Sequence, residues 1–432
     1  MSTRVRTAVC IAATTCLACG QPTTDAPASR VGMVPSEGLV ISNARVLDGT
    51  GGVLEGATLV VRDGRIQSIG PAAADAPGAL QLDATGLTVM PGLIDGHRHI
   101  ISGDADAWLE NEAPDRMREF LETGFTTVLS AIDDEDGILE LRRRVAEGEL
   151  TGPRIVAAAI APVSRPAPGG GARGGGDPAR GDQRAPRRGG ALAIPPEETR
   201  ARIQQIADRG FDAVKVVLAV TPDGPEQETL ALLVEEADRL GLMTITHAVS
   251  VEDTLAAVAA GTTMLVHTPH VGQLTLEQAA TVGGSGIPMT STLGVFVPFF
   301  NDDNEPIFRD AQPYPWNNLL SAGQGPVNAR LLWEAGTVYG FGTDTTFHPR
   351  ETLAHELTSL HVTFSPRDLV SILTRNTAAA IGRSEDLGVL EAGRIADVLV
   401  VEGDPASDIY DVLDVALVIK DGQIVVDNGQ VR

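Results

Sequence analysis

The middle of the chain alternates short apolar segments with amphipathic segments of helical period. Glu197–Arg209, Glu226–Leu240 and Val251–Ala260 place apolar residues at helical spacing and are predicted to form helices. Short apolar strands separated by helices pack as a parallel sheet, and eight such units close into a barrel. The segments with the character of such strands are Thr88–His99, Thr126–Ser130, Arg154–Ala159, Ala213–Leu218, Met243–His247, Met264–His267, Ile287–Leu293 and Val338–Asp344. We therefore predict an α/β protein in which residues 91–385 form a (β/α)8 TIM barrel.

Both ends of the chain are rich in β-forming residues. Leu39–Asp48 and Thr58–Ile69 have the composition of short strands, and Asp63-Gly64 is a strong hairpin turn signal. Ala396–Val401 and Val415–Ile419 have the same character near the other end. Two β-rich ends around a long middle predict one small β-sandwich domain, built from residues 38–90 and 386–432.

The last helix of the barrel has the clearest start signal. Ser365 is a good N-cap, Pro366 suits the first helical position, and Asp368 favours the first turn. We therefore expect the final barrel helix to begin directly after Ser365.

Residues 1–19 have the pattern of a signal peptide. Two arginines precede a short apolar segment, Val9–Ala18, which is too short to span a bilayer stably. The sequence around Cys19 resembles a bacterial lipoprotein cleavage site, in which Cys19 would be the acylated first residue. Cys16 departs from that pattern, so simple secretion is the alternative. We expect an exported protein, periplasmic or lipid-anchored at the outer membrane if bacterial, with residues 20–37 as a linker.

Composition excludes several classes of partner and site. The three cysteines, Cys10, Cys16 and Cys19, all lie in the leader, so the body has no disulfide and no thiolate metal site. The net charge of −24 argues against a nucleic-acid partner. We expect a small-molecule substrate, and the sequence leaves a homo-oligomer open.

The segment Ser164–Gly190 interrupts the barrel pattern. It is rich in Gly, Pro and Arg and carries six arginines against two aspartates, a local charge of +4. Such a segment cannot bury a core and is predicted to be disordered. Two interpretations are open: an insertion without a role, or a basic lid that attracts anionic substrates.

Residues suited to metal binding occur at the C-terminal ends of the predicted strands, where barrel enzymes carry their chemistry. His97 and His99 end the first strand and project together, with Arg98 on the opposite side, because residues i and i+2 share a strand face. The fifth, sixth and eighth strands end in His247, His267 and Asp344. Four of the eight histidines thus converge on one mouth of the barrel, which predicts a metal site.

Lys215 lies in the fourth predicted strand, inside the apolar run from Ala213 to Leu218. Of 33 basic residues, only Lys215 and Lys420 are lysine. A buried primary amine is costly without a partner or a role, so its retention in a chain that otherwise uses arginine indicates a function.

These motifs resemble those of metal-dependent hydrolases of the amidohydrolase superfamily. The similarity is greatest to the branch of imidazolonepropionase-like proteins and Xaa-Pro dipeptidases of the carboxylated-lysine type, and it covers about Leu39–Arg432. The matching segments are Pro91–His99, Val214-Lys215-Val216, Thr246-His247-Ala248, Val266-His267-Thr268, Gly342-Thr343-Asp344 and Leu387–Val400.

The resemblance implies a binuclear site. It places His97, His99 and Asp344 on the more buried metal and His247 and His267 on the other. Lys215, carboxylated by carbon dioxide, would bridge two divalent ions, which we expect to be zinc. A neutral amine can form such a carbamate, and a guanidinium cannot do so readily.

The chain departs from the family pattern at some positions. Val266 stands before His267 where many relatives have Glu, and the loop after the third strand has no His. His270 and His348 could contact substrate or simply line the rim of the barrel. The helical run with His355, Glu356 and His361 is interpreted as solvated or packing residues, since it lacks the second His of a zincin motif.

The hypothesis that the residues favour is hydrolysis of an amide bond in a dipeptide, an N-acyl amino acid or a similar small molecule. A metal-bridging hydroxide would attack the carbonyl, and Asp344 would be the catalytic residue that moves the proton to the leaving nitrogen. The alternatives are a mononuclear cyclic-amide hydrolase or deaminase, in which Lys215 stays a free amine, and a non-catalytic binding protein.

Overall fold

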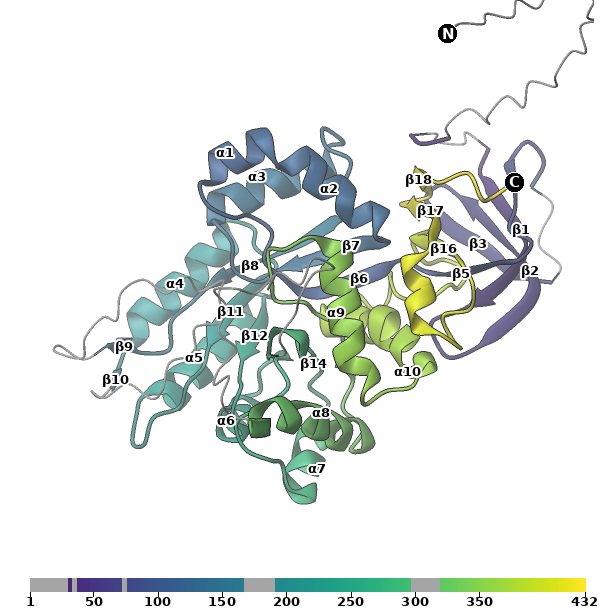
Figure 1. Ribbon diagram of the computed structural model, residues 1–432. Coiled ribbons are helices and arrows are strands. Elements are labelled where there is room, and N and C mark those ends of the chain that lie inside the picture. Colours follow the sequence, from purple (N-terminus) through teal and green to yellow (C-terminus); the bar gives the residue numbers. More distant parts are fainter. Residues whose placement is uncertain (1–29, 33–36, 72–75, 167–190, 297–318) are drawn as a thin grey trace, which may run out of the picture.

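The computed structural model describes residues 30–32, 37–71, 76–166, 191–296 and 319–432. The predicted signal peptide with Cys19, and residues 167–190 of the predicted insertion, lie outside the described residues. A barrel domain lies beside a β domain, as Figure 1 shows. In the described part of the chain, no helix is both long and apolar enough to cross a bilayer.

Both ends of the chain contribute to one mixed eight-stranded sheet, in the order β18-β17-β16-β5-β1-β2-β3, with β4 paired to β1. Its strands are β1 (Leu39–Leu47), β2 (Val53–Arg62), β3 (Arg65–Gly70), β4 (Leu80–Asp83), β5 (Leu87–Pro91), β16 (Val398–Glu402), β17 (Val415–Lys420) and β18 (Gln423–Asp427). The two halves meet where β16 pairs antiparallel with β5. The predicted turn between β2 and β3 is confirmed, because Asp63 and Gly64 both have positive φ.

The second sheet is parallel and contains eight strands in the order β15-β14-β13-β12-β11-β8-β7-β6. They are β6 (Leu93–Arg98), β7 (Phe125–Ser130), β8 (Arg154–Ile160), β11 (Ala213–Val217), β12 (Met243–His247), β13 (Met264–Val266), β14 (Met289–Thr290) and β15 (Tyr339–Gly340). The last strand approaches the first through backbone hydrogen bonds, from Gly96 N–H to the Phe341 carbonyl (2.9 Å) and from Asp344 N–H to the His97 carbonyl (2.7 Å). The predicted barrel is therefore present.

Helices connect the barrel strands and lie outside them (Figure 1). They are α1 (Ala105–Asn111), α2 (Ala113–Glu122), α3 (Glu135–Ala146), α4 (Pro196–Asp208), α5 (Glu226–Arg239), α6 (Val251–Ala260), α7 (Leu276–Gly284), α8 (Leu319–Glu334), α9 (Pro349–His361), α10 (Pro366–Ser371) and α11 (Thr377–Ala380). Shorter elements are the β9–β10 pair (Arg165–Pro166 and Ala191–Leu192), 3-10 turns at Gly294–Phe296 and Ile409–Leu413, and a π turn at Ile372–Asn376. The helix α5 is amphipathic, buries Leu230 and Leu233, and packs against β12.

The single strand predicted over Thr88–His99 is wrong, because the segment divides between the two sheets. β5 ends at Pro91 in the β domain, and β6 begins at Leu93 in the barrel. Pro91 has no backbone N–H to donate to a neighbouring strand. Gly92 packs so tightly against Thr126 that a β-carbon at position 92 would lie 2.4 Å from the Thr126 hydroxyl oxygen. The close approach at Gly92 lets the chain pass from one sheet to the other.

The predicted start of the last barrel helix is confirmed. The Ser365 hydroxyl accepts from Asp368 N–H, and the Asp368 carboxylate accepts from Ser365 N–H at 3.1 Å, which forms a capping box.

We expect Ser365→Ala to lower the free energy of unfolding by about 1 kcal/mol. Denaturant titration measures this, with Ser68→Ala as control, because the Ser68 hydroxyl has no hydrogen-bond partner among the described residues. Equal losses in both variants would contradict the capping role.

Candidate metal centre

The ends of the barrel strands bring the predicted metal ligands to one mouth. His97 and His99 come from the end of β6, and the other predicted ligands come from β11, β12 and the residues just after β13 and β15. His267 (φ 74°), directly beyond β13, and Asp344 (φ 53°), four residues beyond β15, have left-handed backbones. This conformation is uncommon for residues other than glycine, because it costs free energy unless the surroundings hold it. The turns aim both side chains back toward the barrel axis.

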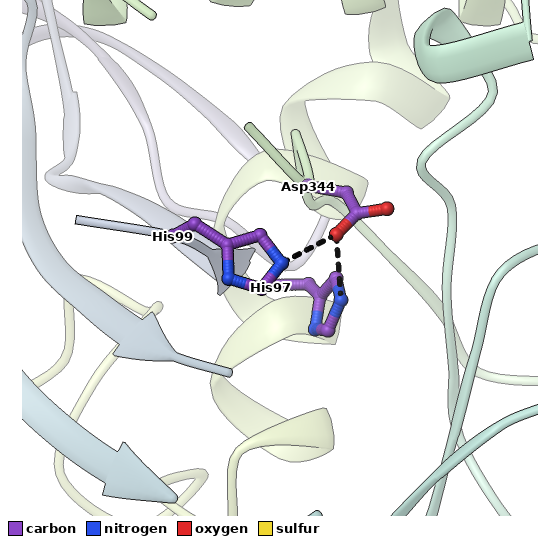
Figure 2. A group of neighbouring side chains, drawn as sticks. All are labelled: His97, His99 and Asp344. Atoms are coloured by element: carbon purple, nitrogen blue, oxygen red, sulfur yellow. Dashed lines mark hydrogen bonds and ion pairs between the residues drawn. The ribbon is translucent and has the colours of Figure 1, made fainter. Parts of the chain in front are cut away.

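Asp344 is the centre of the arrangement. Its Oδ1 atom lies 3.1 Å from His97 Nε2 and 3.0 Å from His99 Nε2 (Figure 2). The ligand atoms of these three residues all lie within 4.8 Å of one another. Two imidazoles and one carboxylate at this spacing could hold a metal ion.

The other three predicted ligands lie against the same group. Lys215 Nζ is 3.4 Å from His97 Nε2. The rings of His247 and His267 have centroids 4.2 Å apart, and His267 Nδ1 is 3.8 Å from Asp344 Oδ2. The structure therefore brings all six predicted residues into one cluster.

The hydrogen bonds of His99 test whether a cation fits. Its Nδ1 atom is 2.8 Å from the Ile132 carbonyl, which can only accept, so Nδ1 carries a proton. In the neutral ring, the Nε2 lone pair then faces the Asp344 carboxylate at 3.0 Å, and two such electron-rich groups repel unless a proton or a cation lies between them. A carbonyl holding the second nitrogen of a metal-binding histidine is the usual arrangement. The donor set therefore fits a metal ion.

The electrostatics of the cluster favour neutral nitrogen donors at neutral pH. Burial, with the nearby Lys215 amine, lowers the pKa of His97 to about 3. Burial also holds the pKa values of His247 and His267 well below the usual range for histidine. Burial lowers the pKa of Lys215 to about 7, so a large fraction of the amine is neutral and nucleophilic near that pH.

The carboxylate stays ionised in this setting. Burial alone would raise the pKa of Asp344, but His97 and His267 hold it well below its usual range, with hydrogen bonds from His97 and His99. Burial would likewise lower the pKa of His99, and its hydrogen bond and attraction to Asp344 raise it instead. The cluster therefore combines one anionic carboxylate with the neutral imidazoles of His97, His247 and His267, and a cation bound beside Asp344 would replace the proton that the raised pKa of His99 favours.

The two predicted substrate contacts differ in position. His270 is buried, burial lowers its pKa to about 4, and its backbone N–H donates to the carbonyl of Val249 at 2.9 Å, two residues after His247. His348 precedes α9 and is exposed, and its Nδ1 atom is 3.0 Å from Glu119 on α2. Its described contact is with the Glu119 carboxylate, which favours the interpretation that His348 lines the rim of the barrel over a substrate contact.

Sequence reasoning missed the residues that orient the ligands. The Thr292 hydroxyl lies 2.6 Å from His267 Nδ1, and Thr292 itself has a left-handed backbone. Asp133 accepts from the backbone N–H groups of Ile100 and Ile101, which directly follow His99. No spacing rule in the sequence connects these residues to the histidines, because the contacts cross between strands.

His355 and Glu356 are buried, so of the two interpretations offered for them, solvated or packing residues, the structure agrees with packing. Glu356 accepts from the Ser291 hydroxyl (2.6 Å) and from Leu293 N–H (2.9 Å), just after β14. His355 Nε2 is 2.9 Å from the Gly294 carbonyl. Glu356 shares an apolar helix face with Leu353 and Leu360, and that spacing is the signal that could have identified it.

Comparisons with known proteins agree with this architecture. A model of the amidohydrolase family matches residues 88–425. An imidazolonepropionase of Symbiobacterium thermophilum is 24% identical over 429 residues, which cover 88% of this chain and 92% of that protein. A 5-methylthioadenosine/S-adenosylhomocysteine deaminase of the same organism is 25% identical over 462 residues, which cover 91% of this chain and 94% of that protein.

A solved structure of a Xaa-Pro dipeptidase with bound methionine in the active site has the same fold. Its TM-score is 0.70 at 23% identity, and the match covers 90% of this chain and 99% of that chain. The barrel with a sheet built from both termini is thus shared with solved structures of this class.

Proposed function

The chain belongs to the amidohydrolase family, and we propose that it uses the cluster around Asp344 to hydrolyse an amide bond of a small molecule. The observation that carries this proposal is the convergence of His97 Nε2 and His99 Nε2 on one carboxylate oxygen, at 3.1 and 3.0 Å. Water would add across the bond, so that an amide gives a carboxylic acid and an amine.

Two divalent metal ions, which we expect to be zinc, would complete this site. His97, His99 and Asp344 would hold one, and His247 and His267 the other, with a carbamate on Lys215 between them. The burial and lowered pKa of Lys215 support this role, since only the neutral amine reacts with carbon dioxide. When bound, the metal ions would supply an activated water at neutral pH and polarise the substrate carbonyl.

The chain's own residues would move the proton. Asp344 faces His97 and His99 with Oδ1, and its Oδ2 atom points toward His267. The carboxylate would accept a proton from the attacking water and deliver it to the leaving nitrogen. His270, which is buried and whose backbone bonds to Val249 just after His247, would contact the substrate.

The proposed substrate class rests on relatives of this fold. We expect a dipeptide or an N-acyl amino acid, and the shared fold with a Xaa-Pro dipeptidase supports this class. A mononuclear cyclic-amide hydrolase or deaminase is the second candidate, because the imidazolonepropionase and the deaminase align over most of this chain. Metal stoichiometry and product identity separate the two.

A hydrolysis screen tests the proposal directly. Protein stripped with a chelator and reloaded with zinc should bind about two ions per chain and cleave dipeptides or N-acyl amino acids, whereas stripped protein should be inactive. His99→Asn should lose metal and activity, and His361→Asn, an exposed histidine on α9, should match the wild type. A second panel of cyclic amides and amino-substituted purines tests the other candidate, and opening of a cyclic amide or release of ammonia with one bound metal would favour it. Absence of C–N hydrolysis across both panels would refute the proposal.

A further inference from the structure

Arg98 is buried behind the histidine pair and bonds to the segment that follows the last strand. Its Nη1 atom donates to the Thr343 hydroxyl (2.8 Å) and to the Thr352 hydroxyl (2.9 Å), and Nη2 donates to the Phe347 carbonyl. The guanidinium carbon lies 5.1 Å from the centre of the Phe120 ring. One side chain from the first strand therefore holds the chain on both sides of Asp344.

The Thr343 hydroxyl connects Arg98 to Asp95 through two hydrogen bonds. An arginine can only donate, so the Thr343 oxygen accepts from Arg98 and its single hydrogen must go to Asp95 Oδ2, 2.6 Å away. Asp95 Oδ1 accepts from the backbone N–H groups of His97 (3.1 Å) and Thr343 (3.2 Å). Arg98 thus donates to Thr343, and Thr343 donates to Asp95. Asp95 also accepts a hydrogen bond from the backbone N–H of His97.

The three residues join the two segments that carry the ligands. Asp344 follows Thr343 directly and has a left-handed backbone, which its surroundings must hold in place. Its own N–H donates to the His97 carbonyl at 2.7 Å. A shift at Thr343 would therefore move the Asp344 carboxylate relative to the Nε2 atoms of His97 and His99.

We propose that Arg98, Thr343 and Asp95 form a positioning relay that sets the place of the Asp344 carboxylate between His97 and His99. All three relay residues are buried, and none of them is among the six predicted metal ligands, so they act on the site through the ligands they hold. The inference rests on the proposed metal function, because the relay acts only through the metal ligands.

A matched pair of variants tests the relay with cobalt(II) as the probe. Thr343→Val keeps the shape of the side chain but loses both hydroxyl hydrogen bonds, whereas Thr343→Ser keeps them and loses only a methyl group. Metal-free wild type and variants are titrated with cobalt(II), and the affinity and the visible absorption of the bound ion are recorded. The absorption reports coordination geometry, which a general loss of stability would not change.

We expect Thr343→Val to bind cobalt(II) roughly 10- to 100-fold more weakly than the wild type, with an altered visible spectrum. Thr343→Ser should keep the wild-type spectrum and an affinity within about threefold. If Thr343→Val does not fold, Arg98→Lys decides the question, because lysine keeps the charge near Asp95 but lacks the planar fork that reaches both threonines.

The outcomes separate the two proposals. Wild-type affinity and spectrum in Thr343→Val, or in Arg98→Lys where that variant decides, would overturn the relay and leave the metal site intact. Equal losses in Thr343→Ser and Thr343→Val would also overturn it, since Thr343→Ser keeps the hydroxyl and the loss would then not depend on the hydroxyl hydrogen bonds. Wild-type protein that binds no cobalt(II) would refute the proposed function, and the relay with it.

Discussion

Asp344→Asn should retain most of its bound metal and lose roughly 10²–10⁴ in kcat, the usual contribution of a general acid or base. Asparagine keeps the shape of the side chain and one oxygen that can face His97 and His99, which now lie 3.1 and 3.0 Å from Oδ1. It cannot accept and return a proton. The acidic limb of the kcat/KM profile should change as well, because an ionised Asp344 would no longer define it.

The measurement pairs metal content with rate on the same preparation of Asp344→Asn. Asp115→Asn is a suitable control, because Asp115 is exposed on α2 and pairs only with Arg118 among its described salt bridges. This control should match the wild type in both quantities. Near-normal kcat with normal metal content in Asp344→Asn would show that Asp344 moves no proton, and His270 would then become the first candidate for the base.

Lys215→Ala should lose at least one metal ion and most activity. The Lys215 amine lies 3.4 Å from His97 Nε2, and burial lowers its pKa to about 7. The neutral amine can attack carbon dioxide and release a proton, which leaves an anionic carbamate with two oxygens for two cations. Alanine removes that bridge and leaves a buried gap of matching size, into which a small carboxylate could enter.

Lys420→Ala is the matched control, because Lys420 is the only other lysine of the chain and pairs with Asp421 in the β domain. It should keep full activity and metal. Added bicarbonate or a short-chain acid should partly restore Lys215→Ala and should have no effect on Lys420→Ala. Full activity with two bound metal ions in Lys215→Ala would refute the binuclear assignment.

The two experiments test different parts of the proposal. A mononuclear enzyme would need the Asp344 carboxylate but would keep its metal in Lys215→Ala, since His97, His99 and Asp344 alone form the compact group that could hold one ion. A binuclear enzyme would show losses in both variants, with metal loss confined to Lys215→Ala. The combination of metal content and kcat therefore identifies which form the protein takes.

The barrel and the positions of the ligands could be predicted because both depend on local periodicity. Apolar segments such as Met243–His247 have the length of buried strands, and the parallel sheet then places every strand end at one mouth. His97 and His99 share a face because side chains alternate along a strand. The rarity of lysine, together with the apolar run from Ala213 to Leu218, marked Lys215.

Contacts between distant segments determined the features that the sequence did not predict. Hydrogen bonds between segments far apart in the chain produce no periodic pattern in the sequence. The division of the predicted strand at Gly92 depends on contact with Thr126, and the orientation of His267 depends on Thr292. The buried path from Arg98 through Thr343 to Asp95 spans about 245 residues of sequence. Residue type and spacing therefore predicted which side chains meet at the mouth, and only tertiary packing decided what holds each of them in place.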